Sequence, residues 1–245
     1  MKAWPYPLWI AHRGAGKLAP ENTLAAFRIG ASHGYRAFEC DVKLSADGVP
    51  FLLHDDTLER TTPEHGVAGE RTWAQLSRMD AGRWHGPAFA GEPLPTLENI
   101  AAYVLHNGFM LNLEIKPTLG QELNTGQVVG REAQGLWAGA EVPPLLSSFR
   151  PEALLGARET APDIPRALLV ESLWPGWFEM AQQLGCVAVV SNYRVMSAEV
   201  LGQLHNNGMR GLVYTVNDAQ TAEVLQAAGI DGIITDAVDF FSPRG

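Results

Sequence analysis

The sequence is poor in cysteine, with only Cys40 and Cys186 among its 245 residues. Two cysteines so far apart provide no disulfide framework of the kind that small secreted domains use, so a reducing compartment suits the chain. Residues 1–10 also lack any apolar run long enough for a signal peptide or a membrane span. We therefore expect a cytoplasmic protein.

Positive charge is scarce as well. The 18 Lys and Arg residues stand against 27 Asp and Glu residues, which gives a formal net charge of −9. Nucleic acids and anionic lipid surfaces are bound through basic faces, so we expect no nucleic acid partner and no stable membrane association. An anionic small molecule would have to be bound by a local group of cations.

Repetition is the main positive feature of the sequence. Short apolar segments typical of buried parallel strands alternate with amphipathic segments, and 245 residues is the usual size of a (β/α)8 TIM barrel. We predict a single barrel domain over residues 1–245. The predicted strands cover residues 8–11, 37–40, 110–113, 145–148, 167–170, 187–190, 212–215 and 232–235, and the predicted helices cover residues 21–33, 97–107, 151–159, 197–206 and 218–228.

Residues 44–95 interrupt this pattern, because one crossover needs far fewer residues. We interpret them as an insertion between the second strand and the helix that follows it. Residues 49–54 are typical of an extra strand, and the stretch beyond, rich in Gly, Pro and Trp, predicts irregular structure over the barrel mouth. Its aromatic residues Trp73, Trp84 and Phe89 would suit a lid or a homodimer contact.

Polar residues end several of the predicted strands, at the end of a barrel where catalytic groups lie. They are His12 and Arg13 after the first strand, Glu39 and Asp41 in and after the second, Glu114 and Lys116 after the third, and Asp236 after the last. Because side chains alternate along a strand, Glu39 and Asp41 share one face, as do Glu114 and Lys116. These side chains can therefore converge on the mouth.

Three carboxylates at one mouth, Glu39, Asp41 and Glu114, would repel each other unless a cation neutralised them. They could also be solvated acids or partners of Arg13, but carboxylates inside an apolar strand favour a metal. Oxygen ligands select a hard cation, so we expect one divalent ion, Mg²⁺ or Ca²⁺, with Mn²⁺ also allowed.

His12 and His54 each follow an apolar run that leads to the mouth. A lone histidine at such a place can simply cap a strand, but two histidines suit a reaction that needs a general base and a general acid near neutral pH. Arg13 and Lys116 would either form salt bridges or bind anionic substrate oxygens. Together these residues suggest phosphodiester cleavage.

Five motifs resemble the signature of the glycerophosphodiester phosphodiesterase family in order and spacing. They are His12-Arg13-Gly14, Pro20-Glu21-Asn22-Thr23, Glu39-x-Asp41, His54-Asp55 and Glu114-x-Lys116. The resemblance covers nearly the whole chain and is greatest to the cytosolic bacterial enzyme linked to glycerol 3-phosphate uptake. It implies a (β/α)8 barrel and metal-dependent hydrolysis of small-molecule glycerophosphodiesters to sn-glycerol 3-phosphate and an alcohol.

The same resemblance implies roles for individual residues. By resemblance Glu39, Asp41 and Glu114 bind the metal, His12 and His54 are catalytic, and Arg13 and Lys116 bind the phosphate. The resemblance also implies that Tyr214, at a position where many relatives carry Trp, binds substrate in the pocket for glycerol or the leaving group. The segment from Pro20 to Thr23 is typical of a helix start, with Glu21 and Asn22 able to reach the site. Asp55 would orient His54 by accepting its ring N–H.

Two other functions fit parts of the sequence. A barrel phospholipase would cleave whole lipids with a similar site, and Trp73, Trp84 and Phe89 favour it, whereas the negative charge weighs against it. A non-catalytic barrel could bind a metabolite or a protein in the same pocket. Binding alone needs no proton-transfer pair, so His12 and His54 argue against this second alternative.

Overall fold

The computed structural model describes residues 4–241 and 243, and within these residues eight parallel strands close into a barrel. Strand β1 pairs in parallel with both β2 and β9, which joins the two ends of the sheet. The strands are β1 (Trp9–Ala11), β2 (Ala37–Leu44), β4 (Met110–Ile115), β5 (Leu145–Ser148), β6 (Arg166–Val170), β7 (Ala188–Asn192), β8 (Arg210–Tyr214) and β9 (Gly232–Thr235). The predicted (β/α)8 fold is confirmed. Within the segment 1–10, for which no signal peptide is predicted, residues 1–3 lie outside the described residues.

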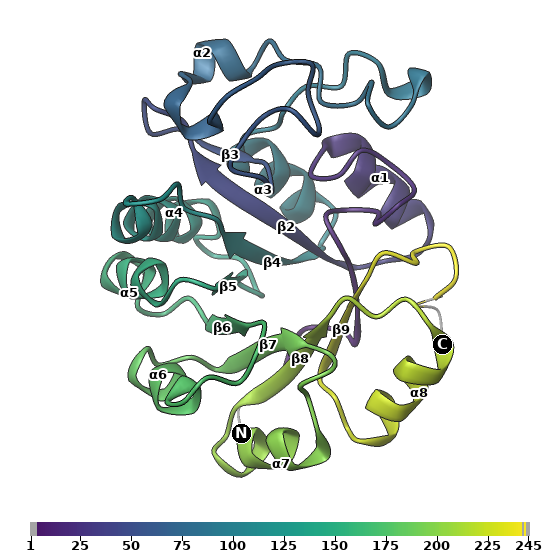
Figure 1. Ribbon diagram of the computed structural model, residues 1–245, viewed down its shortest axis with the longest axis vertical. Coiled ribbons are helices and arrows are strands. Elements are labelled where there is room, and N and C mark those ends of the chain that lie inside the picture. The colour runs from purple at the N-terminus through teal and green to yellow at the C-terminus, as the bar shows by residue number, and fades with distance from the viewer. Residues whose placement is uncertain (1–3, 242, 244–245) are drawn as a thin grey trace.

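Helices surround the strands, as Figure 1 shows. They are α1 (Leu24–Ser32), α3 (Leu97–His106), α4 (Glu122–Leu136), α5 (Pro151–Thr160), α6 (Trp177–Gln183), α7 (Ala198–Asn206) and α8 (Ala219–Ala227). Four of them begin after a side chain that accepts a hydrogen bond from the first turn, namely Thr23, Thr96, Ser197 and Asp218. Among the helices of the described chain, none is both long and apolar enough to cross a membrane.

Helices α4 and α6 are absent from the prediction, and α1 begins later than predicted. Asn22 has a φ of 58°, a left-handed conformation that an α-helix does not admit, so the helix starts only after Thr23. Helix α4 contains Gly126, Gly130 and Gly135, and glycine lowers intrinsic helix propensity. Its stability therefore depends on tertiary packing, which sequence periodicity does not report.

The interior of the barrel is a packed core. Alternate residues of the strands point inward, including Ile10, Leu145, Leu169, Val190 and Leu212, and all are buried. Tyr6, from the segment before β1, packs with them, and its hydroxyl donates to the carbonyl of Pro143 at 2.9 Å. Solvent therefore reaches the polar residues from the opposite, carboxyl end of the strands.

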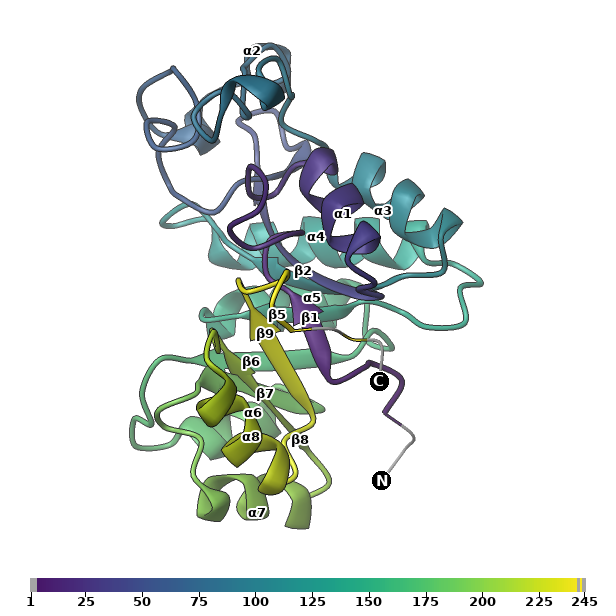
Figure 2. The ribbon, with the colours of Figure 1, turned by 90° about the vertical axis from the view of Figure 1, so that its right-hand side faces the viewer.

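The segment between β2 and α3 forms a separate layer on one side of the barrel. It contains β3 (Pro50–Leu52), α2 (Trp73–Leu76) and two short 3-10 helices, Ala68–Glu70 and Pro87–Phe89. Strand β3 pairs antiparallel with the end of β2, and α2 with its loops projects away from the barrel in Figure 2. A small core that includes Phe51, Leu58, Leu76 and Leu94 holds the layer together.

Close packing of α4 on α5 yields a test of this fold. A Cβ atom added at Gly126 would overlap the backbone carbonyl of Ala153, whereas one at Gly135 would meet no atom within 4 Å. We expect Gly126→Ala to lower the free energy of unfolding by about 1–3 kcal/mol through overpacking. Gly135→Ala, in the same helix, should raise it by up to about 1 kcal/mol. Urea denaturation measures both, and equal effects would contradict this account of the helix contact.

Candidate active site

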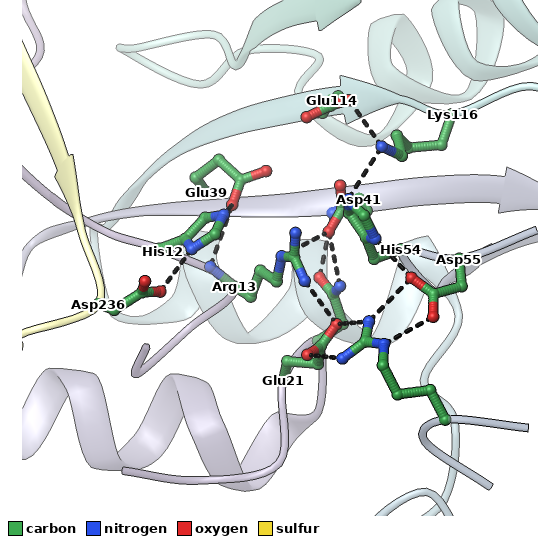
Figure 3. A network of polar contacts seen from close by, with 12 residues as sticks. His12, Arg13, Glu21, Glu39, Asp41, His54, Asp55, Glu114, Lys116 and Asp236 are labelled. Carbon is green, nitrogen blue, oxygen red and sulfur yellow. Dashed lines mark hydrogen bonds and ion pairs between the residues drawn. The ribbon is translucent and has the colours of Figure 1, made fainter. Parts of the chain in front are cut away.

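The predicted site residues lie together at the carboxyl end of the barrel strands (Figure 3). Side chains alternate along β2 and β4, so Glu39 and Asp41 point to the same side as Glu114. The strand register places Asp41 directly opposite Glu114. One oxygen from each of these three carboxylates lies within 4.8 Å of the others, and all three side chains are buried.

This acidic cluster is only partly compensated by the protein. Asp41 Oδ1 is buried and accepts no hydrogen bond from the described residues, whereas the buried Glu114 Oε1 forms an ion pair with Lys116 Nζ at 3.3 Å. Burial and the neighbouring charges of Asp41 and Glu114 raise the pKa of Glu39 well above its usual range. Burial and the charge of Asp41 also raise the pKa of Glu114 to about 7. A buried carboxylate oxygen without a hydrogen bond fits a hard divalent cation.

Asp41 behaves differently because cations surround it. Burial alone would raise its pKa, but Arg13, His54 and Lys116 outweigh burial and lower it. The side-chain amide of Asn22 donates to Asp41 Oδ2 at 2.8 Å, and its oxygen accepts from the Asp41 backbone N–H at 3.0 Å. Asp41 is therefore held as an ionised carboxylate in a fixed orientation.

The turn after β1 aims Arg13 at the carboxylates. Arg13 has a φ of 50°, and its backbone N–H donates to Glu39 Oε2 at 3.0 Å. Its guanidinium donates to Glu21 Oε1 at 2.8 Å, and its Nε lies 3.4 Å from Asp41 Oδ2. Gly14 follows with a φ of 98°, a region that favours glycine. This tight turn explains why glycine follows the arginine in the sequence.

Both histidines are oriented by carboxylates. His12 Nδ1 lies 2.6 Å from Asp236 Oδ1, and its Nε2 lies 3.8 Å from Glu39 Oε2. His54 Nδ1 lies 2.7 Å from Asp55 Oδ1, which leaves Nε2 to accept a hydrogen bond from Lys116 Nζ at 3.1 Å. An ionised carboxylate only accepts, so Nδ1 carries the proton in each pair.

Lys116 and His54 meet although they come from different parts of the chain. The backbone N–H of Lys116 donates to Val42 O at 2.9 Å, and that of Leu53 donates to Asp41 O at 3.1 Å. Both bonds anchor the segments to the end of β2. Lys116 Nζ also lies 3.3 Å from Glu114 Oε1. Burial is the main cause that lowers the pKa of His54.

A cavity of about 290 Å³ adjoins these groups. The predicted residue Tyr214 lines it, and its hydroxyl donates to Glu171 Oε2 at 2.6 Å. Phe149 packs edge-on against Tyr214 with ring centroids 5.8 Å apart. The cavity is therefore lined both by aromatic side chains and by the histidines with Glu39 and Glu114.

Several residues of the mouth are missing from the sequence prediction. Glu171 directly follows the apolar strand β6, so the criterion that found Glu114 could have found it as well. Arg60 donates hydrogen bonds to both Glu21 and Asp55, but it lies in the insertion, where no periodicity marks it. Glu21 and Asn22 do reach the site, whereas Asp236 holds His12.

Three buried carboxylates, two histidines held by carboxylates and two basic side chains meet at the mouth of the barrel, a combination suited to chemistry on a phosphate ester. A profile of the Glycerophosphoryl diester phosphodiesterase family matches residues 12–240. The chain belongs to this glycerophosphodiester phosphodiesterase family. The predicted family and the predicted enzyme class are thereby confirmed.

Individual relatives match almost the whole chain. A putative glycerophosphodiester phosphodiesterase of Bacillus subtilis, YhdW, is 34% identical over 96% of this chain and 97% of its own. A glycerophosphodiester phosphodiesterase of Caldanaerobacter subterraneus subsp. tengcongensis is 32% identical over 94% of this chain and 93% of its own. A phosphodiesterase of Oleispira antarctica, solved with the product sn-glycerol-3-phosphate, aligns with a TM-score of 0.88 and 33% identity over 95% of this chain and 94% of its own.

The raised pKa of Glu114 predicts how pH affects the metal-free protein. Between the usual value of 4.5 and about 7, the folded protein holds a proton that the unfolded chain releases. The stability of the folded state must therefore fall as pH rises through this window. We expect metal-stripped protein to lose on the order of 1–3 kcal/mol of unfolding free energy between pH 5.5 and pH 8. Urea titration at both pH values measures this loss.

Glu114→Gln is the matched variant for this measurement, because it keeps the shape of the side chain and removes the titrating group. It should show a clearly smaller loss between the same two pH values. Adding Mg²⁺ or Ca²⁺ at pH 8 should stabilise the wild-type protein by mass action and stabilise the variant less. An identical pH dependence in the two proteins would contradict the assignment.

Proposed function

We propose that this protein hydrolyses glycerophosphodiesters to sn-glycerol 3-phosphate and an alcohol in a metal-dependent reaction. The observation that carries this proposal is the buried cluster of Glu39, Asp41 and Glu114 beside His12 and His54. The sn-glycerol-3-phosphate bound to the Oleispira antarctica relative supports the class of substrate.

Glu39, Asp41 and Glu114 would hold one divalent ion, and the buried oxygen Asp41 Oδ1, which accepts no hydrogen bond from the described residues, supports this assignment. Hard oxygen ligands fit Mg²⁺, Ca²⁺ or Mn²⁺. When bound, the ion would supply Lewis-acid stabilisation of the charge that builds on the phosphate oxygens. The chain's own residues perform the remaining steps.

Arg13 and Lys116 bind the phosphate in this mechanism. Both cations already face the acidic cluster, at 3.4 Å from Asp41 Oδ2 and 3.3 Å from Glu114 Oε1. They therefore lie where the phosphate of a substrate would meet the carboxylate-bound ion. A guanidinium and an ammonium there stabilise the extra negative charge of the transition state. Tyr214 would contact the organic part of the substrate, because it lines the cavity beside Phe149.

We assign His54 as the general base. Its Nδ1–H donates to Asp55, so Nε2 carries the lone pair, which accepts from Lys116 Nζ at 3.1 Å. Once Lys116 binds the substrate phosphate, this lone pair can take a proton from the attacking hydroxyl, of water or of glycerol C2. His12 lines the same cavity from the end of β1 and acts as the general acid in its doubly protonated form, in which Nδ1–H stays bonded to Asp236 and Nε2–H is the proton that is transferred. It protonates the alcohol oxygen as the bond from phosphorus to that oxygen breaks, because an alkoxide is a poor leaving group.

Metal removal tests the proposal directly. We expect the metal-stripped protein to release no glycerol 3-phosphate from glycerophosphocholine until Mg²⁺, Ca²⁺ or Mn²⁺ is added. Glu39→Ala should remain at least about 100-fold slower with every metal, because several kcal/mol of charge stabilisation are lost. The exposed helix residue Glu132 supplies the control, and Glu132→Ala should match the wild-type protein.

Two results would overturn the proposal. The first is the absence of release from any glycerophosphodiester with any metal, and release from intact phospholipid vesicles alone would then favour whole-lipid cleavage. The second is full activity of Glu39→Ala, which would remove the acidic cluster from the reaction.

The roles of the two histidines can be separated by the leaving group. A p-nitrophenyl ester of glycerol 3-phosphate has a leaving group that needs no proton, so loss of the general acid matters less. We expect His12→Ala to lose about 10²–10⁴-fold in kcat on glycerophosphocholine and much less on the p-nitrophenyl ester. His54→Ala should be slow on both substrates. The reverse pattern would exchange the two roles.

A further inference from the structure

Arg60 lies in the insertion and joins two carboxylates that belong to different parts of the site. Its Nε and Nη2 donate to the two oxygens of Asp55 at 2.6 and 2.9 Å. Its Nη1 and Nη2 donate to the two oxygens of Glu21 at 2.6 and 2.8 Å. One guanidinium therefore makes two bidentate pairs, the geometry in which arginine binds carboxylates most specifically.

Each of these carboxylates holds a different residue of the proposed mechanism. Asp55 Oδ1 accepts from His54 Nδ1 at 2.7 Å, and Glu21 Oε1 accepts from Arg13 Nη1 at 2.8 Å. In Figure 3, Asp55 lies beside His54 and Glu21 beside Arg13. Arg60 is thus linked through Asp55 to the proposed base, His54. It is linked in the same way through Glu21 to the proposed phosphate ligand, Arg13.

The environment of Arg60 indicates that its side chain orients the carboxylates of Asp55 and Glu21 and does not contact the substrate. Its side chain is 43% exposed, and it is not among the residues that line the catalytic cavity. Its backbone is fixed by the buried neighbours Leu58, Thr61 and Thr62, and Thr62 N donates to Leu58 O at 3.0 Å. A rigid turn therefore presents the guanidinium to both carboxylates.

The positive charge of Arg60 also affects the pKa values of both carboxylates. The hydrogen bonds from Arg60 are the main cause that lowers the pKa of Asp55 below its usual range. Burial would raise the pKa of Glu21, but the hydrogen bond from Arg60 and the charge of Arg13 lower it instead. Both carboxylates therefore stay ionised, which lets them accept from His54 and Arg13.

We propose that Arg60 is a positioning residue, whose guanidinium fixes His54 through Asp55 and Arg13 through Glu21 and so aligns the insertion with the barrel mouth. This inference rests on the proposed phosphodiesterase reaction. The positioning role also explains why position 60 holds an arginine. A lysine ammonium keeps the charge but cannot form two bidentate pairs, so the planar guanidinium is required.

Kinetics of Arg60→Lys and Arg60→Ala, measured on the metal-loaded full chain with glycerophosphocholine, test this proposal. We expect both variants to lose about 10- to 100-fold in kcat, because a small displacement of a reacting group is costly. Arg78→Ala is the matched control, since Arg78 is an exposed arginine of the same insertion. Its kcat and KM should equal those of the wild-type protein.

The two arms of the contact can be measured separately. Asp55→Asn should act mainly on kcat through His54, and Glu21→Gln mainly on KM through Arg13. If Arg60 works through Asp55, its substitution should cost much less in an Asp55→Asn background, because residues that act through one contact are not additive. A general loss of stability would give additive losses and no split between kcat and KM.

Three results separate the ways in which the inference can fail. An inactive wild-type protein would defeat the proposed reaction and leave nothing for Arg60 to position. An active wild-type protein with an Arg60→Lys variant of equal kcat would overturn the positioning role alone. Fully additive losses in the Arg60→Ala and Asp55→Asn pair would also overturn it.

Discussion

Mutual repulsion between three buried carboxylates is the constraint on which the mouth of this barrel depends. Glu39, Asp41 and Glu114 lie on adjacent strands with oxygens inside 4.8 Å. Charges this close repel strongly where water is excluded. Arg13 and Lys116 offset part of that repulsion, yet the buried oxygen Asp41 Oδ1 accepts no hydrogen bond from the described chain. The barrel mouth is therefore a negative site that an added cation, or protons, can neutralise, and its two basic side chains face the same point from outside.

The mouth is shared between the barrel and the insertion. His54 belongs to the insertion, but the bond from Leu53 N to Asp41 O places it at the end of β2. Lys116 follows β4 and meets His54 at 3.1 Å. The groups around the mouth thus come from two layers, and the insertion has a small apolar core of its own beside that of the barrel interior. Polar contacts across that boundary consequently set the geometry of the mouth, and the bidentate pair between Arg60 and Glu21 is one of them.

Much of the barrel and many residues of its mouth can be predicted from the sequence, because side chains alternate along a β-strand with a period of two. Alternation along β2 is enough to predict that Glu39 and Asp41 share one face, and the same reasoning applies to Glu114 and Lys116. Helices with a capping residue and an apolar stripe are predictable for similar local reasons. Helix α4 is not, because its packing uses Gly126, which gives close contact with α5 and no periodic signal. A local sequence pattern therefore predicts helices and strands that are stabilised by their own residues. It misses those that are stabilised by packing against another element, as α4 is by α5.

The same distinction separates the residues of the site. A strand end fixes which side chains face the mouth, so groups that line the cavity can be found by their place after an apolar run, and Glu171 obeys this rule too. Arg60 and Glu21 are 39 residues apart and meet only because the insertion folds back over the turn after β1. No periodicity encodes the path of an irregular loop. Residues that hold the site together across loops must therefore be identified from contacts, whereas residues that line it can be identified from strands.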